Sequence, residues 1–246
     1  MIPLLLAAAA VAGPSPAPKA LITGPAARAA AQCPDLVTAD ALVCRALAAQ
    51  KIGDDRAAAQ AFEEAAKASP DKDSKTARMW AAAGNLWIAA GQPANAAADL
   101  DKALALPGLE SAQRGEALLD RARAAEAQND LATARAKLNE AGATVSQDPF
   151  YWYFAASLAM REGDRIGARN AIDRALKLAP TDPTILFEAG HVADYAGDDD
   201  QARLYWQQAS AGDPNGPIGR AAARAIEMLG VAPTVRTEPP AARKAR

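Results

Sequence analysis

The sequence predicts an all-α fold in which about five helix-turn-helix repeats stack and one further helix caps the last of them. Half of the 246 residues are hydrophobic but only 5% are aromatic, and alanine, the strongest intrinsic helix former, dominates. An alanine also recurs with spacings of 38, 38, 34 and 34 residues, at Ala58, Ala96, Ala134, Ala168 and Ala202. A fixed period near 34 residues is typical of stacked-repeat proteins, which usually present a surface rather than a catalytic pocket.

The N-terminal residues 1–31 have the pattern of a secretory signal peptide. A ten-residue apolar run, Ile2 to Val11, precedes a stretch rich in Gly and Pro at residues 13–18, and its length suits a signal peptide better than a membrane helix. Cleavage patterns of small residues end at Ala12 and at Ala31. Because no basic residue precedes the apolar run, a disordered Ala/Pro leader is the alternative. We therefore expect a periplasmic or secreted protein, with a cytoplasmic one as the alternative.

The two cysteines, Cys33 and Cys44, lie eleven residues apart at the start of the first predicted helix. In an exported protein a disulfide between them is reasonable, because a chain that bends back over the helix brings them together. The alternative is a pair of unpaired, small, buried residues. Two cysteines and one histidine cannot form a four-ligand structural zinc site.

Five repeats follow, and in each a short turn joins two helical segments. The repeats span about residues 39–72, 77–110, 115–148, 149–182 and 183–216. The turns are Gly53-Asp54, Gly91-Gln92, Asn129-Asp130, Gly163-Asp164 and Gly197-Asp198. Gly or Asn ends a helix by adopting the left-handed conformation, and Asp begins the next helix by accepting from its free N–H groups.

Two further sets of aligned residues describe the packing that we expect. A small residue in the first helix lets the paired helices approach closely, at Ala46, Gly84, Ala122, Ala156 and Gly190. A larger residue in the second helix is expected to fill the gap against the next repeat, at Phe62, Leu100, Leu138, Ile172 and Trp206. The four-then-three spacing from Ala58 through Phe62 to Ala65 places these residues on one helical face.

These patterns resemble the tetratricopeptide repeat. In the second repeat Trp80, Gly84 and Trp87 match its first-helix pattern, and Leu100 matches its second-helix pattern. The fourth and fifth repeats show the same pattern, and the resemblance covers about residues 39–215. It implies antiparallel helix pairs stacked into a right-handed solenoid, with a concave groove lined by the first helices.

The C-terminal part of the chain continues the pattern for one more helix. Residues 217–230 read as an amphipathic capping helix, because a stack leaves its last apolar face open. Residues 231–246 are rich in Pro and end in basic residues, so we expect disorder there.

The composition argues against enzymes, nucleic-acid binding and cofactors. One histidine, His191, excludes two-histidine metal motifs and multi-histidine catalytic sites, and no phosphate-binding loop or nucleophile elbow is present. The net charge of −2 gives no general attraction to nucleic acid. No apolar stretch is long enough to span a bilayer, so no transmembrane segment is expected after signal removal. We expect neither a catalytic residue, nor a metal, nor a cofactor.

The resemblance places a candidate binding groove on the first helices. The candidate residues are Arg78, Asn85, Arg123, Tyr153, Ser157, Phe187, His191, Asp194 and Tyr195. Aromatic anchors beside polar groups suit peptide recognition, although several of these rings could instead pack between helices.

The function that the sequence favours is a non-enzymatic adaptor that binds a segment of a partner protein in this groove. One alternative is a self-associating structural module of the cell envelope, which would form homo-oligomers. Another is an accessory subunit with a ligand site among the C-terminal aromatic residues.

Overall fold

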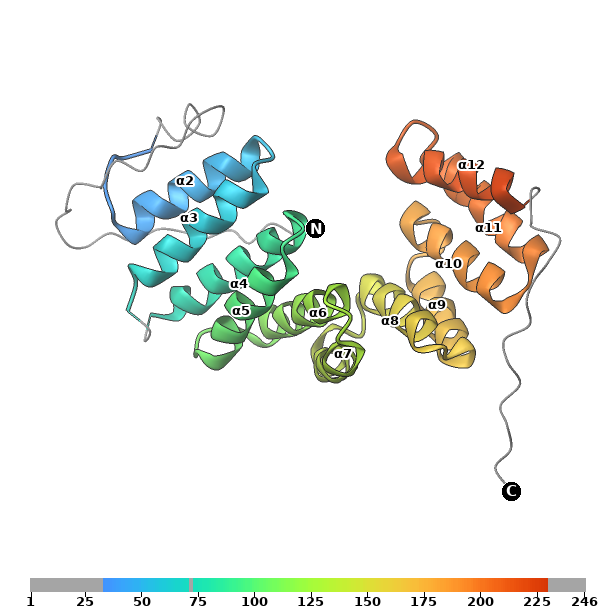
Figure 1. Cartoon of the computed structure of the whole chain (residues 1–246), viewed down its shortest axis with the longest axis horizontal. Coiled ribbons are helices and arrows are strands. Elements are labelled where there is room, and N and C mark those ends of the chain that lie inside the picture. The colour runs from blue at the N-terminus through green and yellow to red at the C-terminus, as the bar shows by residue number, and fades with distance from the viewer. Residues whose placement is uncertain (1–32, 71–72, 230–246) are drawn as a thin grey trace, which may run out of the picture. The chain divides into compact units, whose positions relative to one another are not determined.

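The computed structural model describes residues 33–70 and 73–229, so the expectations for residues 1–31 and 231–246 lie outside the described residues. Within the described residues the chain is all-α, and eleven helices follow one another in antiparallel pairs with one helix at the end (Figure 1). The pairs are α2 (Ala39–Lys51) with α3 (Asp55–Lys67), α4 (Ser74–Ala89) with α5 (Pro93–Ala105), α6 (Ser111–Ala127) with α7 (Leu131–Val145), α8 (Pro149–Glu162) with α9 (Arg165–Leu178), and α10 (Pro183–Ala196) with α11 (Asp199–Gly212). The last helix, α12 (Pro217–Leu229), packs on α11. The predicted fold class is therefore confirmed.

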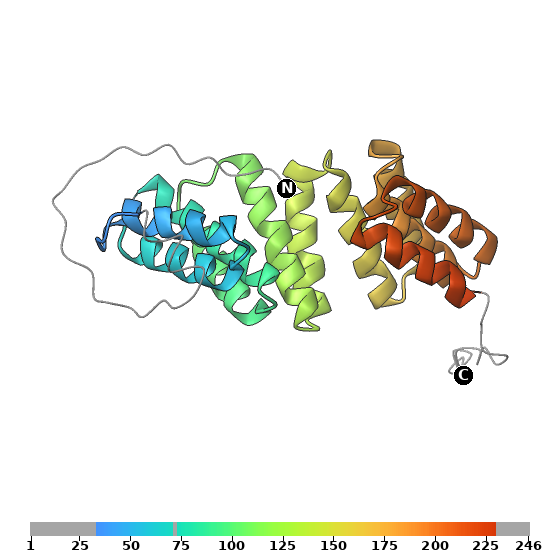
Figure 2. The same ribbon diagram turned by 90° about the horizontal axis from the view of Figure 1, so that it is seen from above.

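These helices form two compact units, and the boundary falls between Gln147 and Asp148. The N-terminal unit holds α2 to α7, and the C-terminal unit holds α8 to α12. Within each unit the two helices of a pair lie side by side (Figure 2). First helices of consecutive repeats also contact each other, α4 with α6 and α8 with α10.

The turns between paired helices adopt the predicted geometry. A left-handed residue follows the first helix of every repeat, with φ between 62° and 86°, at Gly53, Gly91, Asn129, Gly163 and Gly197. An aspartate side chain then accepts from the backbone N–H three residues ahead, at Asp54, Asp130, Asp164 and Asp198. The second repeat differs, because Gln92 makes no side-chain cap bond and Pro93 begins the helix instead.

The small residue of each first helix determines how closely its partner helix can approach. A methyl group at Gly190 would lie 2.2 Å from Nε1 of Trp206 in the same repeat, and one at Gly84 would lie 2.5 Å from Cγ of Leu100. The large residues also share core clusters with the helix that follows, Leu100 with Ala117 and Ala124 of α6 and Trp206 with Ala222 and Ala225 of α12. The indole of Trp206 also donates to the carbonyl oxygen of Phe187 on α10, at 3.0 Å. The small residue and the large residue therefore pack as a matched pair.

A charged cluster covers the tryptophans in the core of the N-terminal unit. The indole of Trp87 donates to Glu63 Oε1 at 2.7 Å. Lys102 donates to the buried carboxylate of Asp99 at 2.8 Å and lies 3.9 Å from the centre of the Trp80 ring. These contacts lie at the edge of an otherwise apolar core that runs through α2, α3, α4, α5 and α6, and the second oxygen of Asp99, Oδ2, is buried there without a hydrogen-bond partner among the described residues.

The matched pair in the fifth repeat is testable by a double-mutant cycle. Gly190→Ala is expected to lower the free energy of unfolding by about 1–3 kcal/mol, because the added methyl overpacks against Trp206. In a Trp206→Ile background the same change should cost little, since it recreates the Ala156 and Ile172 pair of the fourth repeat. Urea unfolding of the four proteins measures the coupling, and an equal cost of Gly190→Ala in both backgrounds would contradict the pairing.

Candidate functional site

In the N-terminal unit, two of the candidate residues meet at a carboxylate that the sequence did not reveal. Asn85 on α4 donates through Nδ2 to Asp120 Oδ2 at 2.7 Å. Arg123, three residues after Asp120 on α6, donates to Oδ1 of the same carboxylate at 2.9 Å. Asp120 therefore joins two consecutive first helices and receives both an amide and a guanidinium group.

The environment of Asp120 combines burial with a compensating cation. Its side chain is only 15% exposed. Burial raises the pKa of the Asp120 carboxyl group, while the charge of Arg123 and the hydrogen bonds from Asn85 and Arg123 act in the opposite direction. The third candidate of this unit, Arg78, is partly buried, and its Nε has no hydrogen-bond partner within residues 33–70 and 73–229.

In the C-terminal unit, the candidate Ser157 also meets a carboxyl group on the next first helix. Ser157 on α8 donates a hydrogen bond to Glu188 on α10. Glu188 is 7% exposed, and burial raises its pKa to about 7 although the bond from Ser157 acts to lower it. Its Oε1 is buried and, in the part of the chain that the structure describes, has no hydrogen-bond partner. One oxygen of this carboxyl group is therefore unsatisfied.

Three aromatic rings of α10 and α11 pack together in the same repeat as Glu188. The rings of Phe187 and His191 meet edge to face, with 4.5 Å between their centres, and His191 meets Trp206 in the same way at 5.3 Å. Burial lowers the pKa of His191, and the negative charge of Asp194 opposes this shift. His191 is therefore uncharged at neutral pH and packs as an aromatic group between two rings.

The remaining candidates of the C-terminal unit divide between two surroundings. Tyr153 is partly buried on α8, where its ring meets the 40% exposed Phe150 edge to face at 6.3 Å. The ring of Tyr195 is instead covered by Arg165 of α9, whose guanidinium carbon lies 5.2 Å from the ring centre. Tyr153 thus adjoins an exposed ring, and Tyr195 contacts a cation of its own chain.

The two polar clusters occupy equivalent positions in their repeats. In each cluster the carboxylate, Asp120 or Glu188, stands two residues before the small residue of its first helix. Arg123 or His191 stands one residue after that small residue, and Asn85 or Ser157 stands one residue after the small residue of the preceding repeat. The two sets are Asn85, Asp120 and Arg123, and Ser157, Glu188 and His191. Comparing aligned positions on both sides of the small residue would have revealed Asp120 and Glu188 from the sequence.

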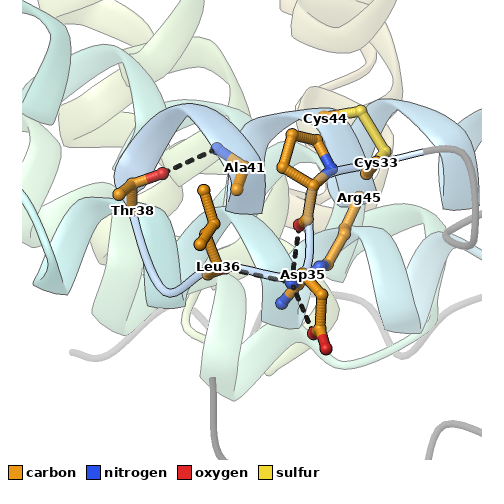
Figure 3. Close-up of a disulfide and its surroundings, with 8 residues drawn as sticks. Cys33, Asp35, Leu36, Thr38, Ala41, Cys44 and Arg45 are labelled. Carbon is orange, nitrogen blue, oxygen red and sulfur yellow. Dashed lines mark hydrogen bonds and ion pairs between the residues drawn. A yellow bond between two sulfur atoms is a disulfide. The ribbon is translucent and has the colours of Figure 1, made fainter. Parts of the chain in front are cut away.

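The structure joins Cys33 and Cys44 by a disulfide, with 5.8 Å between their Cα atoms (Figure 3). Next to it, Arg45 donates to the carbonyl oxygens of Pro34 and Leu36, both at 3.0 Å, and lies 3.6 Å from the carboxylate of Asp35. These bonds hold the segment from Cys33 to Leu36 against α2.

Cys44 occupies the position in the first repeat that Asp120 and Glu188 occupy in theirs, two residues before the small residue Ala46. In the third and fifth repeats this position contacts the preceding first helix. In the first repeat Cys44 bonds to Cys33 instead. The disulfide segment therefore covers the side of α2 on which a further repeat would stack.

Within residues 33–70 and 73–229, no three His, Cys, Asp or Glu side chains are placed so that they could hold a metal ion. None of the helices in that part of the chain combines the length and the apolar character that crossing a membrane requires.

Removal of the disulfide should loosen the start of the N-terminal unit. The double variant Cys33→Ser/Cys44→Ser is expected to lose about 2–3 kcal/mol of stability there, because the bond closes a short loop over α2. Hydrogen exchange measured by mass spectrometry should show faster exchange in α2 and α3 and unchanged exchange in α10 to α12. Equal protection of α2 in both proteins would contradict this role.

Glu188 should make the stability of the C-terminal unit fall as the pH rises. Its pKa in the folded protein is about 7 against 4.5 for the free group, so the folded state holds the proton more tightly. Stability is therefore full below pH 4.5 and falls by about 3 kcal/mol as the pH rises through 7. Glu188→Gln should remove this loss, whereas the exposed Glu227→Gln serves as the control. Chemical unfolding at pH 5 and pH 8 measures this loss of stability. If the free energy of unfolding of Glu188→Gln depends on pH as strongly as that of wild type, Glu188 is not its cause.

Among known proteins, the chain is similar to solved structures, and this similarity concerns its fold. No family model and no curated protein matches the chain. The crystal structure of PilW, described as a widely conserved type IV pilus biogenesis factor, shares 22% identity and a TM-score of 0.63 over 75% of this chain and 82% of that one. Pseudomonas aeruginosa pilF shares 18% identity and a TM-score of 0.59 over 77% and 82%. YrrB, described as a TPR protein with an unusual peptide-binding site, shares 17% identity and a TM-score of 0.53 over 76% and 92%. By structural similarity, the chain has the tetratricopeptide-repeat fold that its sequence pattern resembles.

Proposed function

We propose that this protein is a non-enzymatic adaptor that binds a segment of a partner protein on the first helices of its C-terminal unit. The observation that carries the proposal is the set of partly exposed aromatic residues on α8 and α10. Phe150 and Tyr153 lie on α8, Phe187 and His191 lie on α10, and these two helices contact each other.

This combination of side chains suits an extended peptide. Large rigid rings bury much apolar area for little loss of conformational entropy, so Phe150, Tyr153 and Phe187 can serve as anchors. Ser157 and Asp194 provide polar groups on the same two helices, and such groups fix the orientation of a bound segment. The tetratricopeptide-repeat fold is typically used for protein–protein interaction, which agrees with this assignment.

The chemistry of the site also favours binding over catalysis. The single histidine of the chain is uncharged and enclosed by Phe187 and Trp206, so it is poorly placed to exchange protons with a substrate.

We further propose that the protein works in an oxidising compartment such as the periplasm. Disulfides persist in such compartments and are rare in the cytosol, and Cys33 and Cys44 are paired. The apolar run at residues 2–11 has the length of a signal-peptide core. The similar protein PilW is described as a type IV pilus biogenesis factor, which agrees with an envelope location.

A capture experiment with matched variants tests the adaptor function. Wild type, Tyr153→Ala/Phe187→Ala and the control Tyr205→Ala on α11 are each immobilised and exposed to an extract of the source cells. The double variant should recover the partner at least about tenfold less than wild type, since a hot-spot residue contributes about 2 kcal/mol or more. The control should recover as much as wild type.

Circular dichroism establishes that the variants remain folded, so that a loss of binding reports on the surface. Equal recovery by wild type and by the folded double variant would refute the assignment of the partner to this face.

A further inference from the structure

We propose that Glu188 receives a cationic group of the bound partner, a guanidinium or ammonium side chain that completes the cluster of Ser157, Glu188 and His191. The inference rests on the proposed function and adds to it the chemical class of the bound segment: a peptide with Arg or Lys beside an apolar residue.

The N-terminal unit contains an equivalent carboxylate that is fully paired. In the N-terminal unit the equivalent carboxylate, Asp120, is bonded by the Asn85 amide and by the Arg123 guanidinium. Both of its oxygens are used, and the cation comes from the same helix. That cluster shows which partners a carboxylate at this position needs when it is buried between two first helices.

The C-terminal unit lacks the cation at the equivalent position. His191 stands where Arg123 stands, but its ring packs against Phe187 and Trp206 and is uncharged at neutral pH. Ser157 supplies one hydrogen bond, and Oε1 of Glu188 has no partner in the described part of the chain. The position therefore keeps its carboxyl group and lacks its cation.

A buried acceptor without a partner destabilises a protein, and a buried carboxylate without a cation does so more strongly. A cation from the partner would form a charge-assisted hydrogen bond to Oε1, which is about twice as strong as a neutral one. Binding of the cation would remove the free-energy cost of the unpaired Glu188 oxygen, and this gain would add to the affinity for the partner.

The surroundings of Glu188 suit a long cationic side chain. Ser157, which bonds to the buried carboxyl group, is partly exposed, and so are Phe187 and His191, which stand one residue before and three residues after Glu188 on α10. The methylene stem of Lys or Arg can lie against such rings while its charged head reaches a polar group beneath them. Asp194 adds a negative charge that is felt at His191, on the same helix, and this also favours a cation.

Paired peptides test the inference. The probes are short acetylated and amidated peptides with one arginine next to an aromatic residue, each with a counterpart in which neutral citrulline replaces arginine. Wild type should bind the arginine peptides at least about tenfold more tightly than the citrulline peptides. Glu188→Gln should lose this preference, whereas Asp120→Asn, the matched change in the N-terminal unit, should keep it.

The outcomes separate this inference from the proposed function. If peptides bind, and binding depends on Tyr153 and Phe187 but not on arginine or Glu188, the cation inference is wrong and the adaptor function stands. If no peptide of either kind binds to wild type, both are overturned.

A second measurement does not depend on the peptide sequence. The pKa of Glu188 is followed by the carboxyl carbon signal in NMR, with N-acetylarginine amide as the probe and N-acetylcitrulline amide as the control at equal ionic strength. The arginine probe should lower the pKa of Glu188 and the citrulline probe should leave it unchanged. Equal values with both probes would overturn the inference.

Discussion

The close approach of the two helices in each repeat is the constraint on which the rest of the structure depends. The approach is possible because a small residue of the first helix faces a large one of the second, as Gly190 faces Trp206 and Gly84 faces Leu100. This contact sets the rotation of the first helix about its axis. The residues two places before and one place after the small residue are thereby directed toward a neighbouring first helix, where polar side chains of consecutive repeats meet.

The chain uses this contact between consecutive first helices in three ways. Asp120 accepts a hydrogen bond from Asn85 of the preceding first helix and pairs with Arg123, so the cluster stabilises the N-terminal unit. Cys44, at the same position of the first repeat, bonds to Cys33 and covers the end of the stack. Glu188 bonds to Ser157 but keeps one oxygen without a partner. A position that is structural in the first and third repeats therefore keeps an acceptor without a partner, among the described residues, in the fifth repeat.

Most of the fold could be predicted from the sequence, because its signals are local. Asn129 and Asp130 end one helix and begin the next through bonds to residues a few places away, and the turn appears as predicted. The site could be predicted only in part. Asn85 and Ser157 were named, but their partners lie on the next first helix, and an isolated Asp or Glu in a helix resembles a solvated charge. The contact of Arg165 with the Tyr195 ring depends on the rotamer of an arginine on another helix. The spacing of residues along one helix does not specify that rotamer.

The most direct test of this account gives the C-terminal unit the cation that the N-terminal unit has. In the variant His191→Arg, the new guanidinium stands three residues after Glu188, as Arg123 stands after Asp120. The measurement is an NMR titration of the Glu188 carboxyl carbon in wild type and in this variant. The account predicts that the pKa of Glu188, about 7 in wild type, falls toward the ordinary range of a glutamate in the variant. A pKa that stays near 7 in the folded variant would contradict it.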